Sequence, residues 1–274
     1  MSLVNPEAGL SWSPSFGLVF LRGTTAVPTA PADLAIGTSA IVERTSGVLA
    51  MNMATHDVDT IATLPSSSFM LFVRDANGTV TRSGTTHPFP AQDKHAVMSD
   101  GSIAILRSRE YRVEWIAGNG TRSTSDRIPY PWVSLTADDR ARLLDSIETV
   151  RKAKLDRANA DVAAARAAGR SAGINSALAV PFDSRFIPDY RPAIRQAPAM
   201  LAFVGDADNN VWVLVNMPSA PAGSDVYDVI NRQGQLVDRV VLPNGRHLTG
   251  FGPRGVVFLF SPAGSGQVER ARLR

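Results

Sequence analysis

Short apolar runs separated by turns dominate the last third of the chain. Between Asp206 and Arg274, runs rich in Val, Leu and Phe alternate with Asn-Asn, Gln-Gly, Asn-Gly and Gly-Ser-Gly turns at near-even spacing. This is the sequence form of consecutive antiparallel hairpins. The pattern also occurs at His95–Gly120, where Tyr111, Val113 and Trp115 alternate with polar residues. Alternation with a period of two predicts strands that bury one face.

A unit of about four strands that repeats every ~40 residues is typical of a β-propeller blade. We expect one blade of four strands between Asp33 and Pro65, and then a hairpin at Ser68–Arg82 whose Asn77-Gly78 turn supplies positive φ angles. Inner strands are expected near Lys94–Met98, Ala199–Val204 and His247–Phe251. The sequence therefore predicts an all-β fold, a β-propeller with about four recognisable blades.

One stretch breaks this pattern. Thr136–Ala168 contains no Gly or Pro and is dense in Ala, Arg, Leu and Asp, all of which except Asp favour helices. Thr136 with Asp139 predicts an N-terminal capping box, and Gly169 occupies the place of a C-cap. Large apolar residues form a stripe in the first half only. We therefore expect one long α-helical insertion that docks through its first half and projects through its second.

These patterns divide the chain into five predicted segments. They are an irregular N-terminal segment with one strand (1–31), propeller blades (32–135), the helical insertion (136–170), a Pro-rich return segment (171–198) and C-terminal propeller blades (199–274). The return segment is punctuated by prolines, which predicts extended backbone. The helix is thus inserted between two groups of blades.

Three segments carry a resemblance to a known family: residues 88–120 (PFPAQDKHAVMSDGSIAILRSREYRVEWIAGNG), residues 128–147 (IPYPWVSLTADDRARLLDSI) and residues 206–260. An Asp/Gly turn, an aromatic-containing strand, a Tyr-Xaa-Val and a helical insert after a Pro-rich strand are shared features. The chain resembles the six-bladed β-propeller proteins of environmental bacteria, distantly related to NHL and TolB-like propellers. The resemblance implies the fold and brings no catalytic residue. With about four blades, the chain looks like a partial or N-terminally degenerate member.

Composition and charge exclude several classes of function. With 44% hydrophobic and 19% charged residues, the chain of 274 residues has the composition of a folded globular protein. The net charge is only +3 and the basic residues are scattered, which argues against a nucleic-acid partner. The absence of cysteine excludes disulfides and thiolate chemistry. No apolar run approaches the ~20 residues of a transmembrane helix.

The start of the chain bears on location. Residues 1–16 lack the basic and apolar regions of a signal peptide. We expect a cytoplasmic protein, or a periplasmic or extracellular one if a leader is missing from this chain. The compartment thus stays open.

Candidate metal ligands are few. Asp206, Asp208 and Asn210 have the spacing of oxygen ligands in a calcium loop, but Val211 and Met217 stand where that loop needs Gly and Glu. A polar hairpin turn is the preferred interpretation. The histidines are His56, His87, His95 and His247.

His95 and His247 fall near predicted inner strands, which can converge in a propeller channel. We predict no cofactor and no metal. The alternative is calcium, with His95, His247, Asp206 and Asp208 as candidate ligands.

Two functions are consistent with the sequence, which identifies no catalytic motif. The preferred one is a non-enzymatic binding or scaffold propeller that recognises a protein, peptide or glycan partner. The alternative is a metal-dependent hydrolase or lactonase with its site in the central channel. In the second half of the helix, Arg157, Arg166 and Arg170 are candidate contacts for an acidic partner or a second copy. The oligomeric state is left open.

Overall fold

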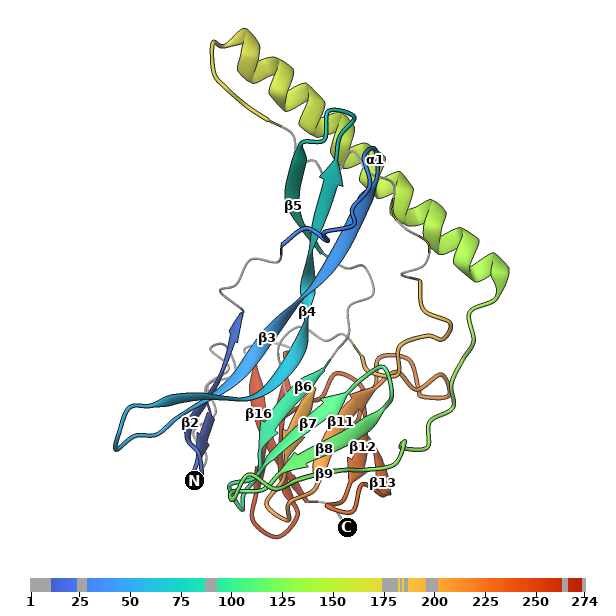
Figure 1. Cartoon of the computed structure of the whole chain (residues 1–274). Coiled ribbons are helices and arrows are strands. Elements are labelled where there is room, and N and C mark those ends of the chain that lie inside the picture. Colours follow the sequence, from blue (N-terminus) through green and yellow to red (C-terminus); the bar gives the residue numbers. More distant parts are fainter. Residues whose placement is uncertain are drawn as a thin grey trace.

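The computed structural model describes residues 11–23, 29–86, 93–173, 182, 184, 187–195, 202–262 and 266–272. Within these ranges the protein is mostly β, with four antiparallel sheets and one long helix (Figure 1). The predicted all-β class with one long α-helical insertion is confirmed. His87 and most of the return segment 171–198 lie outside the described residues.

Three small sheets make up the body of the protein, and each is a meander of consecutive strands. Sheet A contains β6 (Lys94–Val97), β7 (Ile103–Arg107), β8 (Arg112–Ile116) and β9 (Arg122–Thr124). Sheet B contains β10 (Phe203–Gly205), β11 (Val211–Val215), β12 (Val226–Ile230) and β13 (Leu236–Val241). Sheet C contains β14 (His247–Gly252), β15 (Val256–Ser261) and β16 (Gln267–Arg272). The strands β6 and β14 begin where the sequence predicts inner strands.

The fourth sheet, called the arm sheet, differs from a blade. It contains β1 (Ser11–Ser13), β2 (Gly17–Gly23), β3 (Ser39–Met51), β4 (Val58–Arg74) and β5 (Val80–Thr86). The blade of four strands predicted at Asp33–Pro65 is wrong, because β3 runs straight through the expected turn at Thr45-Ser46-Gly47. Register shifts at Glu43/Thr45 and Val48/Leu49 absorb these residues within a continuous ladder. The turn at Asn77-Gly78 is confirmed, with Gly78 at a φ of 81°.

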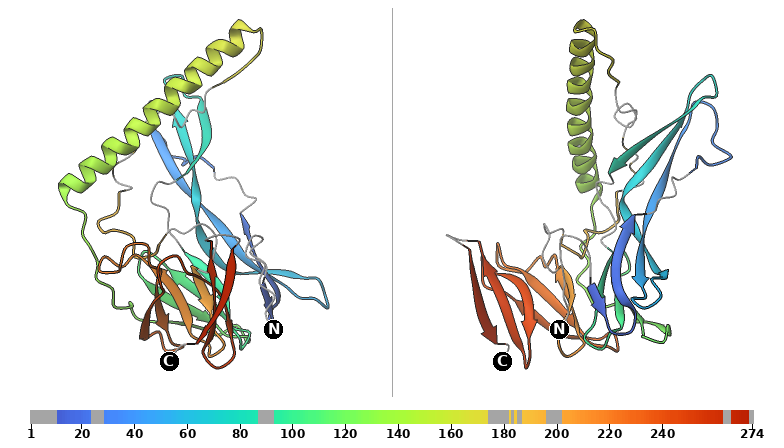
Figure 2. Two further views of the ribbon diagram at one scale, coloured as in Figure 1. Left: turned by 180° about the vertical axis from the view of Figure 1, so that it is seen from behind. Right: turned by 90° about the vertical axis from the view of Figure 1, so that its left-hand side faces the viewer.

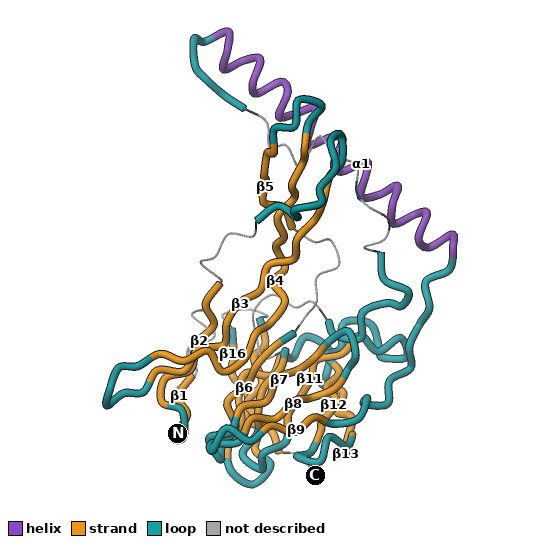
Figure 3. The backbone as a smooth tube through the Cα atoms, in the orientation of Figure 1, coloured by secondary structure: helices purple, strands orange, loops and turns teal. Residues whose placement is uncertain are grey.

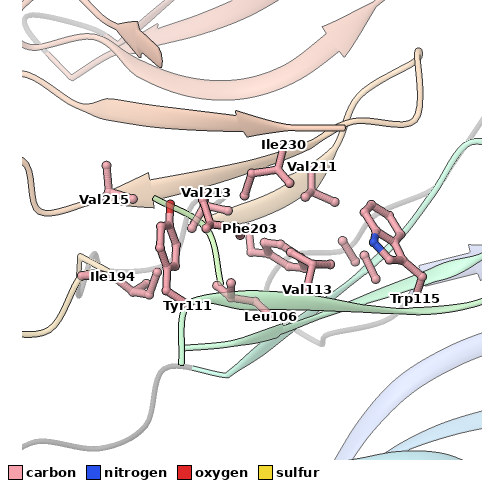
Figure 4. Packing of buried hydrophobic residues seen from close by; sticks show 14 of the residues in the cluster. Leu106, Tyr111, Val113, Trp115, Ile194, Phe203, Val211, Val213, Val215 and Ile230 are labelled. Atoms are coloured by element: carbon pink, nitrogen blue, oxygen red, sulfur yellow. The ribbon is translucent and has the colours of Figure 1, made fainter. Parts of the chain in front are cut away.

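The four sheets stack face to face in chain order, from the arm sheet to sheet C (Figure 2). Side chains of β11 alternate between two clusters: Val211 and Val213 pack toward sheet A, whereas Trp212 packs toward sheet C. Every residue of β11 is therefore buried. Figure 4 shows the cluster between sheets A and B, with Tyr111 and Val213 on facing elements.

A buried carboxylate joins sheets A and B. Asp228 in β12 is fully buried and accepts a hydrogen bond of 2.6 Å from the hydroxyl of Tyr111, which directly precedes β8. Arg239 in β13 donates from Nε to the other carboxylate oxygen at 2.6 Å. Burial, followed by the charge of Asp228, raises the pKa of Tyr111 well above its usual value. The hydroxyl thus stays protonated and remains a donor.

The helix α1 spans Ala137–Ala167 and projects from the stack in the same general direction as the arm sheet (Figures 2 and 3). The predicted capping box of Thr136 and Asp139 is present. Gly169 follows the C-cap with a φ of 69°, and its N–H donates to Arg166 while that of Arg170 donates to Ala165, as in a Schellman motif. No helix in the described ranges has both the length and the apolar character to cross a membrane.

The predicted docking of the helix is wrong in one respect. Its two buried side chains, Val162 and Ala165, lie in the second half, not in the first. The stripe of the first half is only partly buried, and its Val150 is 52% exposed. Leu143, at the start of this stripe, lines a cavity.

Candidate functional site

A cavity of about 730 Å³ lies where the first turns of α1 meet sheet B. Four separate segments line it: 130–135 before the helix, 139–143 at its start, 191–195 in the return segment and 215–226 around the β11–β12 connection. This volume is within the range of sites that bind small molecules or short peptide segments. The cavity is therefore the candidate binding site of the described structure.

Asn216 holds the return segment against the end of β11. Its backbone N–H donates to Ala193 O at 2.7 Å, and its side-chain amide donates to Pro192 O at 3.0 Å and Ile194 O at 3.1 Å. The hydroxyl of Tyr130 donates to the carbonyl of Asn216 from the other side. One residue at the end of a buried strand thus fixes two walls of the cavity.

The lining is apolar over much of its extent. The apolar residues are Val133, Leu135, Leu143, Pro192, Val215, Met217, Pro218, Ala220, Pro221, Ala222 and Val226. Prolines have few conformations to lose, so Pro218 and Pro221 give the β11–β12 connection a preformed shape. Apolar walls of this kind favour a ligand with hydrocarbon surface.

Basic side chains outnumber acidic ones on the cavity wall. Arg142, Arg191 and Arg195 line the cavity, whereas Asp139 is the one acidic residue in its lining. Asp139 Oδ1 lies 2.9 Å from Arg142 Nη2 and 3.9 Å from Arg191 Nη2. The side chains of these two arginines are 75% and 62% exposed, so most of their donors face solvent.

The capping box keeps the carboxyl group of Asp139 ionised. Hydrogen bonds from the Thr136 hydroxyl, then from Arg142 and from the Thr136 backbone, lower the pKa of Asp139 to about 2. The positive end of the helix dipole favours the same ionised form. Asp139 therefore orients the two guanidinium groups without neutralising both.

The third arginine of the cavity, Arg195, pairs with a second buried carboxylate, that of Asp225. Arg195 Nη1 donates to Asp225 Oδ1 at 2.7 Å and to Ser224 O at 3.1 Å. The other oxygen of Asp225 lies 2.7 Å from His247 Nδ1 at the start of β14. Asp225 is buried and thus links the return segment, sheet B and sheet C. His247 is positioned by this contact between sheets.

An aromatic row leads away from the cavity. Tyr111, Tyr130, Trp132 and Tyr190 contact one another in sequence with edge-to-face geometry, at centroid distances of 5.5, 5.2 and 5.8 Å. Tyr130 lines the cavity and Tyr190 is half exposed at the far end of the row. The row gives the cavity rim a rigid apolar border.

The residues predicted as metal ligands lie in turns and strands with other roles. One carboxylate oxygen of Asp206 accepts the N–H groups of Asp208 and Asn210 at 2.9 Å, and the other accepts from Trp212 Nε1 at 3.1 Å. This is the pattern of a polar hairpin turn. The side-chain oxygen of Asn209, in the same turn, accepts hydrogen bonds from the Ser99 hydroxyl and from the N–H of Asp100. These bonds tie sheet B to sheet A.

The histidine candidates are also separated. His95 lies in β6, where burial and then the charge of Lys94 lower its pKa to about 4. His247 contacts Asp225 as described above. Within the described ranges, no three or more His, Asp or Glu side chains form a group that could hold a metal. The assignment of no metal stays a prediction.

The candidate interaction residues on the helix are all on its surface. Arg157, Arg166 and Arg170 are exposed. Arg166 lies in the last turn, where a cation interacts favourably with the helix dipole. From the sequence, Arg191 and Arg195 of the cavity are not singled out, because they belong to no motif, and Arg142 is interpreted only as one of the basic residues on a solvated helix face. The capping box at Asp139 was the one local signal near this site.

Comparisons with known proteins give limited help. A scan against protein families finds no match. A search of curated proteins also finds none. Among solved structures, a streptogramin B lyase is similar at 10% identity and a TM-score of 0.27, covering 99% of this chain and 71% of its own.

Two further structures are similar at the same level. Regucalcin, a calcium-binding protein from Agrobacterium tumefaciens, has 13% identity and a TM-score of 0.22, with 96% of this chain and 83% of its own covered. A catalytically inactive virginiamycin B lyase from Staphylococcus aureus with quinupristin has 10% identity and a TM-score of 0.23, with 86% and 75% covered. TM-scores this low mean that the folds do not superpose. The architecture is therefore described from the sheets of this protein alone.

Proposed function

We propose that this protein is a non-enzymatic binding protein of the propeller type, whose cavity takes a short segment of a partner protein. The segment would carry a carboxylate beside apolar side chains. The observation that supports this is a cavity of about 730 Å³ whose apolar wall carries two exposed guanidinium groups that share one carboxylate. We also propose that the protein belongs to the bacterial six-bladed β-propellers related to NHL and TolB-like propellers.

Arginine suits this role because its planar guanidinium forms paired hydrogen bonds with a carboxylate. Arg142 donates to Asp139 Oδ1 at 2.9 Å and Arg191 lies 3.9 Å from the same oxygen, so an incoming carboxylate would meet two guanidinium groups, one of which is already oriented. Preorganised donors lose less conformational entropy on binding. Apolar side chains of the same segment would then pack on Leu143 and Met217.

A fluorescence titration tests this proposal. The probe is a fluorescein-labelled peptide of alternating Glu and Leu, compared with one of alternating Gln and Leu. We expect the acidic peptide to bind, and the double variant Arg142→Gln/Arg191→Gln to weaken its binding by about tenfold or more. The control Arg127→Gln/Lys154→Gln removes the same charge from exposed positions outside the cavity and should leave binding unchanged.

Equal binding of both peptides, or equal binding by the cavity variant, would rule the proposal out. A glycan partner is a second candidate because Tyr190 presents a half-exposed ring at the end of the aromatic row. Binding of a neutral oligosaccharide that is lost in Tyr190→Ala would favour it over the peptide. The exposed Arg157, Arg166 and Arg170 are proposed as a second contact for an acidic partner, tested by replacing residues 157–171 with a short Gly-Ser bridge.

The enzymatic alternative, a metal-dependent hydrolase or lactonase with calcium in a central channel, has a direct test of its own. Metal analysis of the purified protein, together with melting in the presence and absence of a chelator, measures whether a metal stabilises the native state. Stoichiometric calcium, or a clear fall in melting temperature with chelator, would favour the alternative. An unchanged melting temperature is expected for the binding protein.

A further inference from the structure

Three Asn-Gly pairs occur in the chain, and they begin at Asn77, Asn119 and Asn244. Such a pair can modify itself, because glycine has no Cβ to keep its backbone nitrogen away from the asparagine side chain. All three asparagines lie in turns, and all three are exposed. Residue type and solvent access are therefore the same at the three pairs, and the local hydrogen bonding separates them.

Two of the pairs have the glycine nitrogen bound within the turn. The N–H of Gly78 donates to Asp75 O at 3.0 Å, and the N–H of Gly120 donates to Ala117 O at 2.8 Å. In both turns the glycine is the fourth residue, whose N–H closes the turn. A nitrogen whose proton is shared with a carbonyl gives up that proton less readily, so it is a poorer nucleophile.

The third turn is shifted by one residue. Its closing donor is the N–H of Arg246, which bonds to Pro243 O at 3.0 Å, so Gly245 is the third residue of the turn and not the fourth. Gly245 has a φ of 72°, the positive value that the third position of a type II turn requires. Within the part of the chain that the structure describes, neither the N–H of Gly245 nor the side-chain amide of Asn244 has a hydrogen-bond partner. Of the three pairs, this one leaves both reacting groups free.

We propose that Asn244 is a site of spontaneous deamidation through a succinimide ring. The backbone nitrogen of Gly245 forms a bond to Cγ of Asn244, while the bond from Cγ to Nδ2 breaks. Ammonia leaves, carrying overall the proton that the Gly245 nitrogen gave up. Water then opens the ring at either of its carbonyl carbons and supplies the oxygen of the new carboxylate. The products are aspartate and isoaspartate, and water is the sole co-reactant.

The new carboxylate would lie against the wall of the cavity. A Cβ on Gly223 would lie 2.5 Å from Asn244 Oδ1, so the amide packs directly on the Gly223 backbone. Gly223 and Ser224 line the cavity, and the carbonyl of Ser224 accepts a hydrogen bond from Arg195. Deamidation therefore adds a negative charge beside a cavity whose lining has more arginines than carboxylates. The reaction itself does not depend on which ligand the cavity binds, so it is separate from the function proposed above.

Peptide mapping by mass spectrometry tests the proposal, with the other two pairs as internal controls. The folded protein is incubated in mildly alkaline buffer, and the conversion of each asparagine from amide to carboxylate is followed over time. We expect Asn244 to be converted about fivefold faster than Asn77 or Asn119, the ratio that corresponds to one net hydrogen bond. Aspartate and isoaspartate forms of the peptide that contains Asn244, separated by chromatography, should both appear.

Two further measurements separate the effect of the turn from that of the sequence. In guanidinium chloride the turns are lost, and the three rates should become similar. Asn244→Gln should abolish conversion at this position, since glutamine would have to form a larger ring, and should leave the rates at Asn77 and Asn119 unchanged. Equal rates at the three pairs in the folded protein, or slower conversion at Asn244, would overturn the proposal. A rate ratio that persists in guanidinium chloride would also overturn it, because the flanking sequence and not the turn would then set the rate.

Discussion

Sheet B and the arm sheet are both antiparallel meanders, but their burial is very different. All five residues of β11 and all five of β12 are buried. In β3, burial is confined to Gly47–Ala50, the part that lies over sheet A, while the remainder is partly or fully exposed. The comparison shows that the number of covering sheets decides burial here. Strand propensity alone does not.

The two regions also differ in how they are fixed. Sheet B carries Asp225 just before β12 and Asp228 within β12, and each carboxylate bonds to groups from a neighbouring sheet. The outer part of the arm sheet relies mainly on its own ladder and on a hairpin turn, with one exposed ion pair between Glu43 and Arg109 of the β7–β8 turn. We therefore expect substitutions in sheet B to affect global stability and those in the arm to act locally.

The largest expected effect is at Asp228. In Asp228→Ala, the hydroxyl of Tyr111 and the guanidinium of Arg239 lose their shared acceptor in a buried setting. Such a loss costs about 3 kcal/mol of the free energy of unfolding. Chemical denaturation measures it, with Asp138→Ala on the exposed helix surface as control. A loss below about 1 kcal/mol would mean that this carboxylate does not hold sheets A and B together.

A matched pair of valines tests the comparison directly. Val213 is fully buried in β11, whereas Val80 is 43% exposed in the arm. We expect Val213→Ala to cost about 2 kcal/mol, because it leaves a cavity between two sheets. Val80→Ala should change the free energy of unfolding by about 0.5 kcal/mol or less. Equal effects in the two variants would show that the arm belongs to the same cooperative unit as the stack.

The sequence predicts the body better than the arm for a physical reason. In sheets B and C, turns with Gly in positive φ follow each apolar run, so local signals and tertiary packing agree. In the arm, Thr45-Ser46-Gly47 has the composition of a turn, yet pairing with β4 keeps it in a strand. Long-range pairing overrode local preference there, which a single sequence does not reveal.

The cavity shows the same limit. The capping box at Thr136 and Asp139 follows from spacing alone, and the structure confirms it. That Arg191 would reach the same carboxylate depends on how the return segment packs on β11 through Asn216. No local pattern encodes that contact. The cavity therefore required the three-dimensional arrangement.

The last prediction is a pH dependence that reports on the contact between sheet A and the arm sheet and that is small only near neutral pH. His95 alternates with Ala96 in β6 and shares the strand face of Val97, which packs toward the arm sheet. Burial, then the charge of Lys94, lowers the pKa of His95 from 6.5 to about 4. Between these two pH values the unfolded chain binds a proton that the folded protein does not. Stability therefore falls as the pH drops from 6.5 toward 4, by at most about 1.4 kcal/mol per pH unit.

Urea denaturation at a series of pH values measures this slope, and His95→Gln should remove its contribution. The exposed His56 provides the control, since His56→Gln should leave the slope unchanged. If the arm sheet separated readily from sheet A, His95 would be solvated and its pKa would return toward 6.5. An unchanged slope in His95→Gln would thus show that the arm does not cover β6 in solution, and it would place the boundary of the stable stack at sheet A.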